Sequence, residues 1–109
     1  MKLPDTIRFG SRKIKIVKIP ESEASKKKIF GEYCSTTETI TIDQDLNLIQ
    51  SSNTLLHELC HFIFDEYKLD EEIKKKDEEK ICNSIANALC HLLHDNPQLL
   101  DYIYNSLKK

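Results

Sequence analysis

The chain has 109 residues, of which 31% are charged and 39% hydrophobic, and a formal net charge of −2. Its length suits a single domain over residues 1–109, and its charge gives no reason to expect binding to nucleic acid or to a membrane surface. No apolar run approaches the roughly 18 residues that cross a bilayer. The N-terminus lacks a hydrophobic signal core, so we expect a cytoplasmic protein.

The first part of the chain predicts a β-hairpin. Residues 7–9 and 12–19 flank a Gly-Ser turn, and Ile14 and Ile16 alternate with lysines, as in a half-buried strand. Residues 21–28 are polar and charged and predict a solvated loop.

The rest of the chain predicts two more strands and then helices. They are, in order, strands at 29–33 and 39–42, a helix from Ser51 or Ser52 to about Tyr67, a helix from Asp70 through Leu93, and a short helix capped by Asn96 with Pro97 first. Strands followed by helices indicate an α+β fold, with a small antiparallel or mixed sheet of three to four strands packed on the helices.

The most informative motif is His57-Glu58-Leu59-Cys60-His61, which reads H-E-x-x-H inside an apolar run. Histidines four residues apart share one helix face and can bind one zinc ion. Glu58, next to the first histidine, is placed to act as general base toward water. The alternative is two core histidines bonded to backbone carbonyls, which leaves three polar side chains to be satisfied in an apolar helix.

The third zinc ligand is sought on the following helix. Glu79 is the preferred candidate and Glu78 the alternative, because helical phase alone does not separate neighbours near a helix start. Asn83 is a candidate for supporting the ligands. His91 lies about a dozen residues further on, roughly 18 Å along a helix, and both His91 and His94 are expected to face solvent or cap the helix C-terminus.

The four cysteines are expected to be reduced, because no secretory context favours disulfides. Cys60, Cys82 and Cys90 fall on apolar helix faces and behave as small hydrophobes. The alternative is a structural zinc site built from Cys34, Cys60 and Cys82, although no C-x-x-C pair is present.

With these residues, the chain resembles the small zinc metallopeptidase-like proteins of phages and prophages, which are related to the gluzincins and similar to the minigluzincins. The matching segments are residues 31–33, 39–43, 54–61, 78–82, 87–89 and 93–100. The resemblance implies a zincin-like fold, one zinc ion, and Glu79 as the family's recurring acid. It also implies a peptide substrate extended along an edge strand, for which the strand at 39–42 is the natural choice.

The predicted function is zinc-dependent hydrolysis of peptide bonds in a peptide or protein substrate, with Glu58 as general base. Tyr33, Tyr67 and Tyr102 are candidates for the oxyanion donor that such a reaction needs. Two other functions stay open: a weak or latent zincin-fold binding or regulatory protein of phage origin, and a structural zinc module. The protein is expected to be a monomer or weak dimer. The final helix is expected either to restrain the active site or to cover the core.

Overall fold

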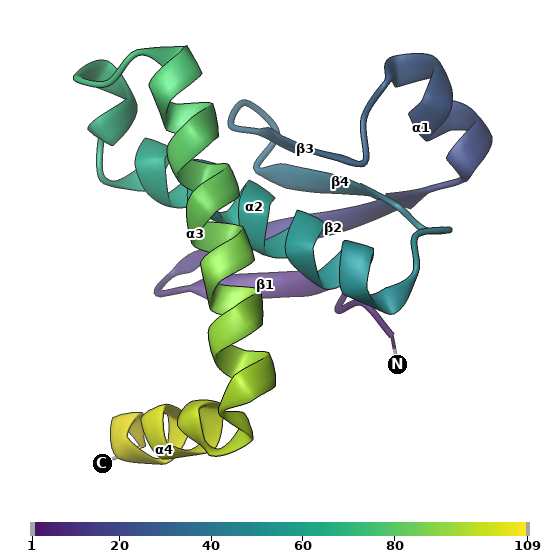
Figure 1. Cartoon of the computed structure of the whole chain (residues 1–109). Coiled ribbons are helices and arrows are strands. Elements are labelled where there is room, and N and C mark those ends of the chain that lie inside the picture. Colours follow the sequence, from purple (N-terminus) through teal and green to yellow (C-terminus); the bar gives the residue numbers. More distant parts are fainter. Residues whose placement is uncertain (1, 109) are drawn as a thin grey trace.

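The computed structural model describes residues 2–108, and it has the predicted α+β architecture (Figure 1). Four strands and one short helix make up the first part of the chain, and the rest is mainly helical. The elements are β1 (Thr6–Phe9), β2 (Arg12–Ile19), α1 (Glu21–Lys27), β3 (Gly31–Cys34), β4 (Thr39–Asp43), α2 (Leu48–Glu66), the 3-10 turn η1 (Leu69–Glu71), α3 (Lys75–Asp95) and α4 (Pro97–Leu107). No helix within the described residues is long and apolar enough to span a membrane.

The four strands form one mixed sheet in the order β1-β2-β4-β3. The hairpin of β1 and β2 is confirmed, and Gly10, with a φ of 59°, supplies the left-handed residue of its turn. β4 pairs in parallel with β2 and antiparallel with β3. The prediction that residues 39–42 form the edge strand is therefore wrong, since β4 is interior and β3 forms that edge.

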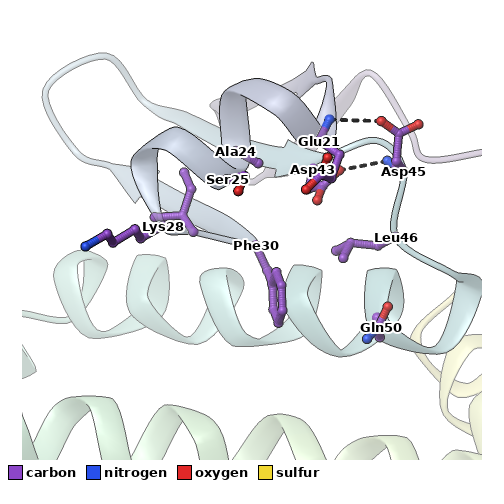
Figure 2. A pocket seen from close by; sticks show the side chains of 10 residues that line it. Glu21, Ala24, Ser25, Lys28, Phe30, Asp43, Asp45, Leu46 and Gln50 are labelled. Carbon is purple, nitrogen blue, oxygen red and sulfur yellow. Dashed lines mark hydrogen bonds between the residues drawn. The ribbon is translucent and has the colours of Figure 1, made fainter.

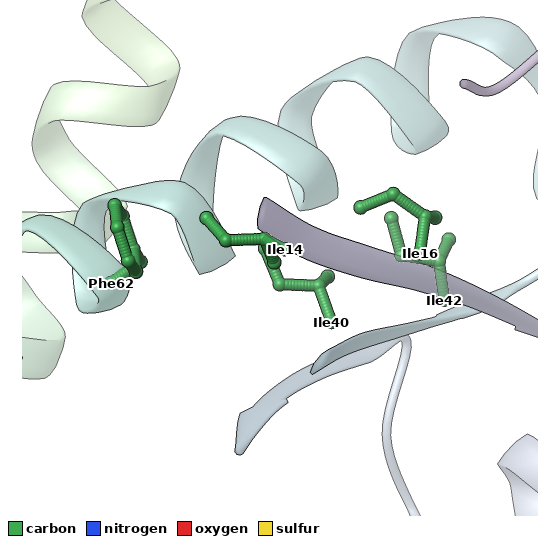
Figure 3. Packing of buried hydrophobic residues seen from close by; sticks show 5 residues of the cluster. All are labelled: Ile14, Ile16, Ile40, Ile42 and Phe62. Carbon is green, nitrogen blue, oxygen red and sulfur yellow. The ribbon is translucent and has the colours of Figure 1, made fainter. Parts of the chain in front are cut away.

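The core lies between the sheet and α2. Its buried cluster consists of isoleucines from β2 and β4 and one aromatic ring from α2: Ile14, Ile16, Ile40, Ile42 and Phe62 (Figure 3). Phe62 is 1% exposed and meets Tyr33 edge-on, with ring centroids 5.8 Å apart. This packing fixes the position of α2, the helix that carries the H-E-x-x-H motif, relative to β3 and β4.

Residues 21–27 form helix α1, so the predicted loop is wrong. Ala24, a residue of this helix, is fully buried and packs this otherwise charged segment against the rest of the protein. The Glu21 N–H donates to Asp45, and the Asp45 N–H donates to Asp43, at 2.9 Å each (Figure 2). These bonds fix α1 beside a pocket of about 550 Å³ at this end of the sheet.

Two predicted helix starts and one strand start also differ from the structure. α2 begins three residues before Ser51, because the Asn47 side chain accepts the Gln50 N–H and caps the helix. α3 begins at Lys75, and the predicted start at Asp70 lies in the 3-10 turn η1. β3 begins at Gly31, two residues later than predicted.

The final helix was expected to restrain the active site or to cover the core, and both expectations are wrong. α3 continues to Asp95, beyond the sheet, and α4 starts there and packs mainly on the end of α3 (Figure 1). Leu100, Ile103 and Leu107 are therefore exposed. The Asn96 side chain does not cap α4; it donates to the Leu92 carbonyl of α3.

Candidate metal centre

The motif residues lie in the second half of α2, where that helix packs against α3 (Figure 1). Four residues of helix separate His57 from His61, so both imidazoles lie on the face that meets α3. Their side chains are 12% and 17% exposed. Both rings are thus largely shielded from solvent while their Nε2 atoms point to a common place.

Donor atoms of three residues converge at that place. The Nε2 atoms of His57 and His61 are 3.1 Å apart. Glu79, from the first turns of α3, places one carboxylate oxygen 2.8 Å from His57 Nε2 and the other 2.9 Å from His61 Nε2. Ligands about 2.0–2.1 Å from a tetrahedral zinc ion lie roughly 3.3 Å from one another, so the spacing fits one ion. Two imidazoles and one carboxylate are also a donor set of catalytic zinc sites.

Glu78 occupies a different position from its neighbour Glu79. Its carboxylate lies 2.6 Å from His61 Nδ1, on the opposite side of the ring from the converging atoms. The Glu78 side chain is 14% exposed, whereas that of Glu79 is 54% exposed. The fully buried Cys82, one turn further along α3, places its Sγ 3.6 Å from the same Nδ1.

Glu58 bonds to β3 with one carboxylate oxygen and approaches the converging atoms with the other. Its Oε1 accepts the backbone N–H of Tyr33 at 3.0 Å, and its Oε2 lies 3.9 Å from His57 Nε2. Burial of the Glu58 carboxyl raises its pKa, and the charges of His57 and His61 and the Tyr33 N–H oppose that shift. The result is a carboxylate beside the imidazole pair that holds a proton more readily than an ordinary glutamate does.

Gly31 allows this approach of β3 to α2. A Cβ at this position would lie 2.5 Å from Thr54 Cγ2 and 3.4 Å from Glu58 Cγ. Any side chain at residue 31 would therefore push β3 away from the helix and from Glu58.

Comparison with protein families gives a match over most of the chain. The model of the IrrE N-terminal-like domain, Peptidase_M78, matches residues 10–102. The chain belongs to this family. Comparison with curated proteins and with solved structures finds no match.

The IrrE N-terminal-like family is a zincin-like metallopeptidase family, so the resemblance stated from the sequence is confirmed. The match covers β2, β3 and β4 and all of α2 and α3. The three converging donors and Glu58 therefore belong to the part of the chain that defines membership.

The other candidate residues lie elsewhere. His91 and His94 are exposed near the end of α3, and His94 pairs with Asp95 at 3.1 Å. The Tyr33 hydroxyl donates to Asp65 at 2.8 Å. Tyr67 and Tyr102 are 62% and 72% exposed.

Two features of the site were missed from the sequence, and the expectation for Asn83 was wrong. Asn83 is exposed, and Cys82 instead borders His61. The Tyr33 backbone N–H, not a side chain, positions Glu58. The sequence held a signal for this contact. Gly31 is one of only two glycines in the chain, and it is the first residue of a strand and not part of a turn. A glycine in a strand often marks a close approach of another segment.

Proposed function

We propose that the protein is a zinc-dependent peptidase whose metal ligands are His57, His61 and Glu79. One observation carries this proposal: two imidazole nitrogens and a carboxylate from a second helix converge at ligand spacing, with a buried carboxylate next to them. Membership of a zincin-like metallopeptidase family supports it.

His57, His61 and Glu79 would hold a zinc ion, and that ion would supply Lewis acidity toward a peptide carbonyl and water. Glu58 then acts as general base: it takes the proton of the attacking water on a carboxylate oxygen and transfers it to the leaving amine. In the metal-free structure the raised pKa of Glu58 favours the first of these steps, because a stronger base accepts a proton more readily. The Tyr33 N–H holds one oxygen and leaves the other for this transfer.

The edge strand β3 is the proposed docking place for the peptide backbone. The Asp43 N–H bonds to the Phe30 carbonyl, so Phe30 and every second residue after it turn their backbone polar groups toward β4. Gly31 and Tyr33 turn theirs outward, and the Tyr33 N–H reaches Glu58. Because Glu58 already accepts the Tyr33 N–H, a peptide paired with this edge would bond to its other outward backbone groups and lie beside the general base. A pocket of about 420 Å³ lined by Tyr33, Asp65 and Glu78, among others, adjoins this edge.

One observation favours the second candidate, a weakly active or latent zincin-fold binding protein. None of the three tyrosines considered as oxyanion donors is placed for that role, because the Tyr33 hydroxyl is bonded to Asp65 and Tyr67 and Tyr102 are largely exposed. A site without such a donor would bind zinc and a peptide but turn over slowly.

Metal analysis and peptide hydrolysis with a Glu58→Gln variant test the proposal. We expect one zinc per chain in both proteins. The parent should hydrolyse a generic peptide at a measurable rate, and the variant should not. Zinc binding by both proteins with no hydrolysis by the parent would favour the binding protein. Loss of zinc in Glu58→Gln would show that Glu58 is a ligand and not the base.

A further inference from the structure

The two ring nitrogens of His61 face different carboxylates on α3. Nε2 lies 2.9 Å from Glu79, and Nδ1 lies 2.6 Å from Glu78. Neighbouring residues on a helix point about 100° apart, so α3 can present two adjacent carboxylates to opposite edges of one ring.

A carboxylate on Nδ1 decides which nitrogen is able to bind a metal. Neutral imidazole carries one proton, and only its unprotonated nitrogen is a ligand. The Glu78 carboxylate can only accept a hydrogen bond, so it keeps the proton on Nδ1 and leaves the Nε2 lone pair facing the converging atoms. The same bond fixes the ring orientation and makes Nε2 more basic.

Glu78 is held in this place by the packing of α3. Cys82, one turn along, and Ala86, one turn further, are both fully buried, so this stripe of α3 faces α2. Glu78 lies at the N-terminal end of that stripe, one turn before Cys82, and its side chain is only 14% exposed. His57 has no such carboxylate within the described residues; its contacts with Glu58 and Glu79 are both made by Nε2.

We propose that Glu78 is a positioning residue that binds His61 Nδ1 and so presents Nε2 to the metal. The inference rests on the proposed function, in which His61 Nε2 is a zinc ligand. It assigns the two adjacent glutamates different roles: Glu79 touches the metal and Glu78 acts through His61.

A competing arrangement uses the same atoms. His61 Nδ1, Glu78 and Cys82 also lie within 4.8 Å of one another, the spacing of a metal-binding group. The geometry favours the positioning role, because Glu78 is at hydrogen-bond distance from Nδ1 and Cys82 is fully buried, without access for an ion.

Zinc affinity, measured by competition with a chelator, tests the proposal on Glu78→Ala, Glu78→Gln and the matched control Asp77→Asn, which changes an exposed acid in the same helical turn. We expect Glu78→Ala to weaken binding about 10- to 100-fold. Glu78→Gln should recover much of the loss, because its amide oxygen still accepts from Nδ1–H. Asp77→Asn should bind like the parent.

A second measurement reports on His61 directly. In zinc-loaded protein labelled with ¹⁵N-histidine, we expect a slowly exchanging Nδ1–H signal from His61 that persists in Glu78→Gln and is lost in Glu78→Ala. This signal is independent of peptide hydrolysis, and the Gln variant remains decisive if the Ala variant does not fold.

Each alternative gives a distinct result. Parent-like affinity and an unchanged Nδ1–H signal in Glu78→Ala would overturn the positioning role and leave the proposed function intact. Complete loss of zinc in both Glu78 variants, with retention in Glu79→Ala, would make Glu78 a ligand. Two ions per parent chain and one in Cys82→Ser would establish the competing metal group. If the Glu78 variants and Asp77→Asn bind zinc as expected but the parent hydrolyses no peptide, the peptidase function would be refuted and the positioning role of Glu78 supported.

Discussion

Replacing Gly31 with alanine tests whether the close approach of β3 to α2 holds Glu58 in place. The added Cβ would lie 2.5 Å from Thr54 Cγ2, whereas carbon atoms in contact are about 3.5–4.0 Å apart, so the strand must retreat by about 1 Å. Overpacking of this kind costs about 1–3 kcal/mol. The retreat also stretches the 3.0 Å bond from the Tyr33 N–H to Glu58, and a hydrogen bond to a charged group contributes about 1.5–3 kcal/mol.

The two costs, less the gain of about 0.4–1 kcal/mol from a less flexible unfolded chain, give an expected loss of about 1.5–5.5 kcal/mol in the free energy of unfolding. The loss lies toward the lower end of this range when the Tyr33 bond is stretched and not broken. Urea unfolding of the metal-free protein measures this loss of stability. The rate of peptide hydrolysis by the zinc-loaded protein should also fall. Thr54→Ser removes the methyl group that the new Cβ meets. In that background, Gly31→Ala should cost no more than about 1 kcal/mol.

Gly10→Ala is the matched control. Gly10 has a φ of +59° and nothing within 4 Å of the added Cβ, so alanine there should cost about 1–2 kcal/mol through backbone strain and leave hydrolysis unchanged. The reasoning about Gly31 would be refuted by a cost below about 0.5 kcal/mol, or by an equal cost with and without Thr54→Ser.

Three further predictions concern other parts of the molecule. A hydrogen bond from the Thr37 side chain lowers the pKa of Cys34. Burial raises the pKa of Cys82 to about 12. A disulfide reagent should therefore modify Cys34 first, and should still do so as the pH falls below the usual thiol range. Cys82 should react only when the protein unfolds. Peptide mapping identifies the labelled cysteine, and early labelling of Cys82 would contradict its burial. A chain ending at Asn96 should keep its zinc affinity and melting temperature, since α4 packs mainly on the end of α3; increased hydrolysis would instead show restraint by α4. Phe62→Ala should cost about 3–5 kcal/mol in urea unfolding, whereas Ile63→Ala, at a position 41% exposed, should cost far less; equal costs would refute the position of the core.

Much of the local structure follows from the sequence. The hairpin of β1 and β2 could be predicted because alternation and the Gly-Ser turn act over a few residues. The placement of His57 and His61 on one face of α2 is likewise local, because helix geometry fixes residues four apart. α1 was missed because its only buried residue is Ala24, which leaves almost no apolar pattern to detect.

The tertiary structure decided what depends on packing between distant segments. Sequence alone determined the H-E-x-x-H helix and an acidic pair on the next helix, but not which acid faces which nitrogen of His61, because that depends on how α3 is rotated against α2. The edge position of β3 follows from the parallel pairing of β2 and β4, which no local pattern encodes. The same pairing brings Gly31 and the Tyr33 N–H to Glu58, so the surroundings of the candidate general base arise only when the sheet packs on α2.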